Sequence, residues 1–138
     1  MIDCFITHVW RQSPQWTDFE NFLYKDNIIE WRNFSLPWHD PALKVSSGIG
    51  KKLLMDNLTH QITPTDLFFL LESLYEKQSN HYWLDFQTDV AKKNNIPIVV
   101  VPDNDTIDID IKFDFDYIRI KNNYDSLHQT VKKLNLNK

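Results

Sequence analysis

One neutral amide lies on a helix face that should pack against other elements. On a 3.6-residue period Trp83, Gln87 and Ala91 share one stripe, so Gln87 lies between an indole and a methyl group. A carboxamide can hydrogen-bond a ligand hydroxyl, but it carries no charge and cannot act as a base near neutral pH. Gln87 is therefore the first candidate for a functional position.

Other reactive or ligand-binding side chains follow the expected strands. In an open parallel sheet, ligands bind outside the carboxyl ends of the strands. The candidates at those ends carry hydroxyl, imidazole, carboxylate or aromatic groups: Thr7, His8, Trp10, Phe34, Ser35, Trp38, His39, Asp40, Glu72, Ser73, Tyr75 and Trp83. Such an aromatic-rich cleft suits a flat, sugar-bearing ligand such as a nucleotide.

Several familiar motifs are missing. Without GxGxxG or GxxxxGK[ST], neither a Rossmann fingerprint nor a P-loop would hold phosphates. The segment "SGIG", Ser47 to Gly50, could cradle a phosphate, although a helix cap is the commoner role for such a sequence. His8 and His39 lack a paired Asp or Cys motif, which favours ordinary surface or interface histidines. No HExxH or GxSxG supports a protease or an α/β-hydrolase.

The elements that would position these residues alternate between short apolar runs and helical patterns. This alternation predicts an α/β fold with a parallel sheet. The expected strands are 2–9, 30–36, 66–73 and 96–102. The expected helices begin after the N-cap Ser13 and at Gly48 and His81, and a closing helix covers 124–134. Residues 37–47 are expected to form a loop, and Ile49, Leu53 and Leu58 are spaced roughly as residues on one packed face of the second helix.

Residues 106–117, "TIDIDIKFDFDY", alternate apolar and charged side chains. Period two indicates one dry and one wet face, as on an edge strand or on a flap over the core. The aspartates could bind a divalent cation, but side chains along one strand face diverge, so a solvated face is the better interpretation and no metal site is predicted.

Composition limits the function classes. The chain has 138 residues, 42% of them hydrophobic, and a net charge of -4, which fits one domain and argues against nucleic-acid binding. Neither a signal peptide nor a membrane-length apolar run is present, so we expect a soluble, cytoplasmic protein. The single cysteine, Cys4, lies in an apolar run and is expected to be a buried thiol.

The order of these motifs resembles a TIR domain, in particular the TIR-like family that includes the ThsB proteins of Thoeris antiphage defence. Four stretches carry the resemblance: "CFITHVW", "WRNFSLPWHDP", "DLFFLLESLYEKQSNHYW" and the helix-to-strand segment ending in "IPIVVV". It covers residues 1–102 of a chain that we expect to be a single domain over 1–138. It implies a flavodoxin-like TIR fold, with a five-stranded parallel sheet and helices on both faces.

The resemblance also implies an activity and a site. Many TIR domains cleave NAD+, and Thoeris proteins make an ADP-ribose-derived signal for a separate effector. NAD+ would be the substrate, and no cofactor is implied. The match places Thr7, His8 and Trp10 at the floor of the NAD+ pocket, and Phe34, Ser35 and Asp40 in or beside the BB loop. Ser73 and Tyr75 match the loop after the central strand, and Trp83 matches the helix-opening tryptophan. Self-association through Leu36 to Lys44 is a linked expectation.

The family's catalytic glutamate corresponds to Gln87. Three explanations remain open: an engineered change that traps a ligand, a natural pseudoenzyme that still binds nucleotide, or another acid serving in its place. Asp89 is rotated by ~200° from Gln87 on the helix and is a poor substitute, which leaves Glu72. We therefore expect an NAD+-cleaving enzyme with weak or absent activity, or alternatively a TIR-like binding or scaffold module without chemistry.

Overall fold

The computed structural model describes residues 1–9, 13–36, 48–102 and 113–136. These residues form an α/β fold around a five-stranded, all-parallel sheet of order β2-β1-β3-β4-β5. The strands are β1 (Ile2–Ile6), β2 (Trp31–Asn33), β3 (Leu67–Leu71), β4 (Ile98–Val101) and β5 (Ile118–Arg119). The flavodoxin-like order confirms the predicted fold class.

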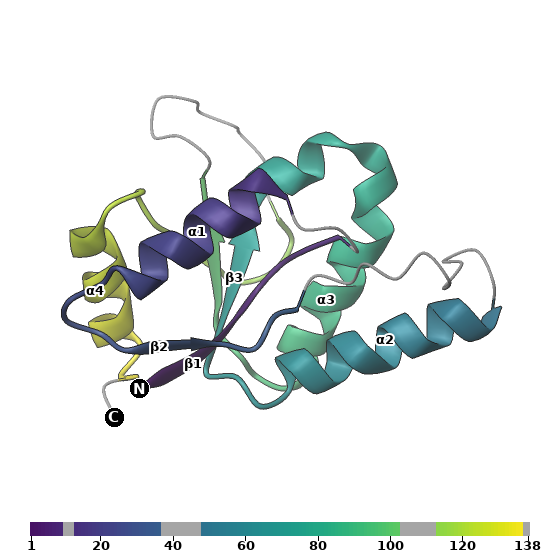
Figure 1. Ribbon diagram of the computed structural model, residues 1–138, viewed down its shortest axis with the longest axis horizontal. Helices are drawn as coiled ribbons and strands as arrows, with labels where there is room; N and C mark the ends of the chain where they lie inside the picture. The colour runs from purple at the N-terminus through teal and green to yellow at the C-terminus, as the bar shows by residue number, and fades with distance from the viewer. Residues whose placement is uncertain (10–12, 37–47, 103–112, 137–138) are drawn as a thin grey trace.

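Helices cover both faces of the sheet (Figure 1). They are α1 (Pro14–Tyr24), α2 (Gly48–Ile62), α3 (His81–Lys93) and α4 (Tyr124–Lys133), with short 3-10 turns η1 (Glu72–Glu76) and η2 (Gln78–Asn80). Successive strand residues pack alternately on the two layers: Cys4 and Ile6 with α1 and α4, Phe5 with α2 and α3. Strands covered in this way need apolar side chains on both faces, and all five residues of β3 are buried.

The first two helices follow the sequence pattern with one correction. Ser13 caps α1 by accepting the Trp16 N–H at 3.2 Å, and Trp16, Phe19 and Leu23 are buried as predicted. In α2, however, Leu53 is 45% exposed, so its predicted place on the packed face is wrong. Leu54 takes that place, because a spacing of four from Leu58 keeps it on the buried stripe.

Helix α3 places the amide as its spacing predicts. Trp83, Gln87 and Ala91 are all buried, and Gln87 is fully enclosed. The helix ends at Lys93 with Asn94 as its C-cap, and Asn95 follows in the left-handed region with φ of 56°. This turn leads directly into β4, as the sequence indicates.

The segment before β5 has the predicted alternation without the strand. Residues 106–112 lie outside the described part of the chain, and residues 113–117 form no strand, so an edge strand is wrong for these five residues. Asp114 and Asp116 are exposed, whereas Phe113, Phe115 and Tyr117 are partly buried and contact one another. An aromatic flap over the α2–α3 layer therefore describes these residues, and β5 begins directly after them.

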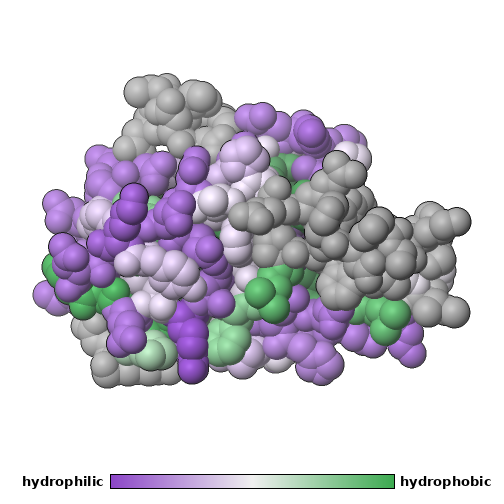
Figure 2. Space-filling model, viewed as in Figure 1, coloured by the Kyte–Doolittle hydropathy of each residue, from purple (hydrophilic) through white to green (hydrophobic). Residues whose placement is uncertain are grey.

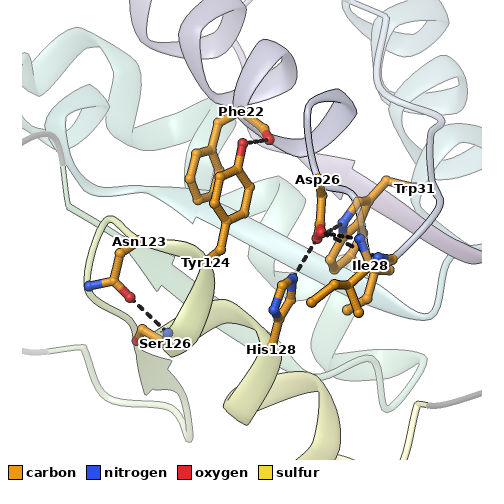
Figure 3. A network of polar contacts seen from close by, with 9 residues as sticks. Phe22, Asp26, Ile28, Trp31, Asn123, Tyr124, Ser126 and His128 are labelled. Carbon is orange, nitrogen blue, oxygen red and sulfur yellow. Dashed lines mark hydrogen bonds and ion pairs between the residues drawn. The ribbon is translucent and has the colours of Figure 1, made fainter.

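A network of polar contacts docks α4 against the start of β2 (Figure 3). The carboxylate of Asp26, 1% exposed, accepts hydrogen bonds from the Ile28 and Ile29 N–H groups and from the Trp31 indole N–H, and lies 2.8 Å from His128 Nε2. Beside it, the ring of Tyr124 stacks on a phenylalanine of α1, Phe22, at 4.2 Å, and its hydroxyl donates to the Phe22 carbonyl. The network ties the last helix to elements about a hundred residues earlier.

No helix in the described residues is long and apolar enough to cross a membrane. On the face seen in Figure 2, apolar side chains form small patches separated by polar ones. Cys4 is fully buried as predicted, and burial, with Asp3, Glu20 and Asp66 adding to it, raises the pKa of its thiol far above the usual value. The thiol is therefore a core group.

Candidate functional site

The carboxyl ends of β1 and β3 meet where the sheet order reverses. From β1 the chain moves outward to β2 and then crosses back over β1 to β3, which creates a topological switch point. Thr7 joins the two strands there: its N–H donates to the Phe69 carbonyl at 2.9 Å, and its hydroxyl accepts the Leu71 N–H at 2.8 Å. Thr7 thus has a structural role at the floor of the candidate site.

The residue after Thr7 is paired with Gln87 through its backbone. The His8 N–H donates to Gln87 Oε1 at 3.2 Å, and Gln87 Nε2 donates to the His8 carbonyl at 2.6 Å. These partners distinguish the oxygen of the Gln87 carboxamide from its nitrogen, since a backbone N–H can only donate and a carbonyl can only accept. Gln87 therefore pairs with the end of β1 as a neighbouring strand would.

The His8 ring is buried and neutral. It is 2% exposed, so of the two ordinary positions expected for it, surface or interface, the surface position is wrong. Burial lowers its pKa to about 4, against the opposing effect of its hydrogen bond with Gln61. Gln61 Oε1 accepts the Leu36 N–H at 2.9 Å and lies 3.2 Å from His8 Nε2, so Nε2 carries the hydrogen and Nδ1 keeps a lone pair.

A narrow crevice lies beside this pair, between α2 and α3. Its lining combines leucines, one indole, three carboxamides and the imidazole: Leu36, Leu54, Leu58, Trp83, Asn57, Gln61, Gln87 and His8. The open volume is about 10 Å³, which is room for at most one water molecule. The structure thus brings together His8, Trp83 and Gln87 of the predicted site.

Unpartnered buried polar atoms gather at the same edge of the sheet. Within the described residues these side-chain atoms are His8 Nδ1, Glu72 Oε1 and Ser73 Oγ. All three follow directly or closely after β1 or β3. Because buried polar groups are nearly always hydrogen-bonded, this cluster needs partners beyond the described residues, whether from another part of the chain, from water or from a ligand. It coincides with the edge where parallel sheets bind ligands.

Other predicted site residues lie away from the crevice. The Ser35 hydroxyl accepts the Trp16 indole N–H at 3.1 Å and so faces α1, while Phe34 lies under the Arg32 guanidinium at 4.9 Å. Tyr75 contacts Phe113 of the aromatic flap, and burial, with the nearby Asp85, raises the pKa of its phenol. The predicted residues Trp10, Trp38, His39 and Asp40 lie outside the described residues.

Neither candidate acid takes the place of Gln87. Glu72 is 1% exposed, is bound to Arg119 of β5 at 2.5 Å and does not line the crevice. Asp89 is 59% exposed and lies 3.7 Å from Lys92 on the outer side of α3, as its helical rotation predicts. Within the described part of the chain, no cluster of three or more His, Cys, Asp or Glu residues could hold a metal ion.

Two polar lining residues were not predicted from sequence. Asn57 and Gln61 come from α2 and lie four residues apart, beside the stripe of Leu54 and Leu58. That spacing places them on one face of the helix, a signal that was present in the sequence. It could be used only once α2 was known to pack beside α3.

Comparison with known proteins gives no match among protein-family models, curated proteins or solved structures. The structure itself defines a flavodoxin-like α/β domain, with a crevice at the end of β1 to which the described residues contribute no formally charged side chain.

Proposed function

We propose that this chain is a TIR-like domain of the Thoeris type that binds NAD+ or an ADP-ribose-derived nucleotide at the ends of β1 and β3. In this form it cleaves NAD+ weakly or not at all. The observation that supports the proposal is the place of Gln87: the position that the resemblance assigns to the catalytic glutamate lines the crevice beside Trp83 and His8. A cytoplasmic setting, a diffusible signal and a separate effector belong to the same proposal.

The contacts of Gln87 bear on the three explanations for the missing acid. A glutamate here would put a carboxylate oxygen where Gln87 Nε2 now donates to the His8 carbonyl at 2.6 Å. Two acceptors at that distance repel each other, so the local backbone suits an amide better than a carboxylate. With Glu72 bound to Arg119, these contacts favour a natural, weakly active or inactive domain over an engineered change or a replacement acid.

A second candidate is a TIR-like scaffold without chemistry, and the size of the crevice favours it. An open volume of about 10 Å³ cannot hold a nucleotide unless side chains move. Leu36, 67% exposed, begins the segment through which we expect self-association. A scaffold would use that segment and leave the crevice closed.

Nicotinamide release from NAD+ separates these functions. The enzyme hypothesis expects Gln87→Glu to raise the rate by ~10²–10³, because one preorganised charged group at the reacting centre contributes about that much. Asn21→Asp adds the same charge on α1, across the sheet from the crevice, and should leave the rate unchanged.

Calorimetric titration with ADP-ribose and NAD+ tests binding separately. Binding by the unaltered chain, with no release by Gln87→Glu, would indicate a nucleotide-binding pseudoenzyme. Absence of binding, together with absence of release under crowded conditions, would contradict the proposal and leave the scaffold.

A further inference from the structure

A second hollow lies at the carboxyl edge of the sheet, in the opposite layer from the crevice, and we call it the α1 groove. Its lining includes Leu71 and Val101, the last residues of β3 and β4, and Pro102, which follows β4. Asn122, from the segment between β5 and α4, completes this side. The open volume is about 340 Å³, which is within the range of small-molecule sites, and ligands of parallel sheets bind at this edge.

One stripe of α1 forms the other wall of the α1 groove. Gln15, Asp18, Phe19 and Phe22 occupy positions i, i+3, i+4 and i+7, so they lie on the same side of the helix. A stripe that only packed against the sheet would be apolar throughout. Here the half nearest the helix start is polar and the other half is aromatic. The wall therefore presents hydrogen-bonding groups beside two rings.

The two rings of this wall are fixed by neighbouring rings. Phe19 is 5% exposed, and its ring lies edge-on to Phe69 of β3 at 4.8 Å. Phe22 stacks on Phe19 at 5.8 Å and on Tyr124 at 4.2 Å (Figure 3). Rings held in this way lose little freedom when a ligand packs against them, so they form a preorganised apolar surface.

The polar half of the wall supplies a negative charge. Asp18 is exposed at the groove, where its carboxylate attracts a cation, and Gln15 can both donate and accept hydrogen bonds. The faces of the neighbouring rings, Phe19 and Phe22, also attract positive charge. A carboxylate beside fixed rings is therefore complementary to an organic cation with an apolar body.

We propose that the α1 groove binds a small organic cation with an aromatic body, of which an arylalkyl ammonium is the type. The ring of the ligand would pack against Phe19 and Phe22, and its ammonium group would lie beside Asp18. The groove belongs to the layer of α1 and α4, across the sheet from the crevice. The inference thus goes beyond the proposed function and does not depend on it.

Three probes of similar outline separate charge from shape. 2-Phenylethylammonium is a cation at pH 7, 2-phenylethanol is neutral and phenylacetate is an anion. We expect NMR titration of the full chain, followed at the backbone amides of Asp18, Val101 and Asn122, to give a Kd about threefold lower for the ammonium than for the alcohol, as an exposed ion pair contributes. Phenylacetate should bind most weakly.

Three outcomes of this titration would overturn the inference. They are equal affinities for the ammonium and the alcohol, tighter binding of the anion, and no binding of any probe. Shifts confined to the crevice between α2 and α3 would also overturn it, because the probes would then occupy the other layer.

A matched pair of variants locates the charge. Asp18→Asn keeps the shape of the side chain and should make the affinities for the ammonium and the alcohol equal. Asp89→Asn removes the same charge from the outer side of α3, in the other layer, and should leave the preference unchanged. A preference that persists in Asp18→Asn, or that disappears in Asp89→Asn, would contradict the assignment to the α1 groove.

Phe22→Leu tests the aromatic part of the wall. The variant keeps an apolar side chain but removes the ring, so it should raise the Kd of both the ammonium and the alcohol by about twofold or more. The amide spectrum of α4 shows whether that helix remains docked without the stack on Tyr124. Unchanged affinities in the folded variant would show that the ligand does not pack on this ring.

Discussion

The Asp26 network and the Gln87 pair are both buried polar sites, but their partners differ in kind. Around Asp26, three N–H groups and His128 Nε2 surround one carboxylate. Gln87 meets one N–H and one carbonyl of the same residue, His8. A carboxylate is favoured where all neighbouring polar groups are donors. An amide is favoured where one neighbouring group donates a hydrogen bond and another accepts one.

The ionisable groups of the two sites also differ: Asp26 is charged at neutral pH and His8 is neutral. Burial alone would raise the pKa of Asp26, but hydrogen bonds from Trp31, Ile28, His128 and Ile29 outweigh burial and hold it below its usual value. At the end of β1 burial dominates and lowers the pKa of His8. Asp26 therefore keeps its charge at neutral pH, whereas the His8 imidazole is neutral there.

The largest expected effect comes from removing Asp26, whose polar contacts hold α4 against the start of β2. Asp26→Ala leaves four donors without their acceptor, three of them partly buried, and we expect the free energy of unfolding to fall by about 4 kcal/mol. Asp26→Asn should cost about half as much, because one amide oxygen still accepts. Urea denaturation at pH 7 measures both. A loss near zero for Asp26→Asn would show that the charge of Asp26 contributes nothing.

A smaller effect comes from the titration of His8. Its folded-state pKa is lowered from 6.5 to about 4, so the neutral form favours the folded chain and stability is lost as the pH falls between those values. The loss should reach about 3 kcal/mol. The contribution of Asp26, whose pKa is depressed, is present above its unfolded value near ~3.9 and is lost only below it.

Urea denaturation from pH 7 to pH 4 checks this window. In His8→Gln, which cannot titrate, the decrease between pH 6.5 and pH 4 should be much reduced. A variant whose stability falls as steeply as that of the unaltered chain would refute the assignment to His8.

The smallest expected effect comes from placing a carboxylate, like that of Asp26, at position 87. Gln87→Glu should lower the free energy of unfolding by about 2 kcal/mol at pH 7, because an introduced carboxylate would face the His8 carbonyl. The deficit relative to the unaltered chain should shrink at lower pH, where the introduced carboxyl is protonated and can donate. Denaturation of both chains at pH 7.5 and pH 5 measures the difference. If Gln87→Glu lost more stability relative to the unaltered chain at pH 5 than at pH 7.5, position 87 would not face an acceptor as described.

The sequence predicted the sheet because buried parallel strands have an unmistakable composition, as in β3. It predicted the stripe of Trp83, Gln87 and Ala91 because helical spacing fixes which residues share a face. It did not predict the partners of that stripe. The pairing of Gln87 with His8 spans 79 residues, and the burial of His8 depends on α2 packing above it. Contacts of this range arise from tertiary packing, which periodicity does not encode.

Gln87 also acts as a tethered ligand. Its side chain is a primary carboxamide that occupies both the N–H and the carbonyl of His8. A short tether maintains an effective concentration on the order of millimolar or higher. Any other group that seeks these two backbone atoms must displace a competitor that cannot diffuse away, so its affinity for them has a built-in ceiling.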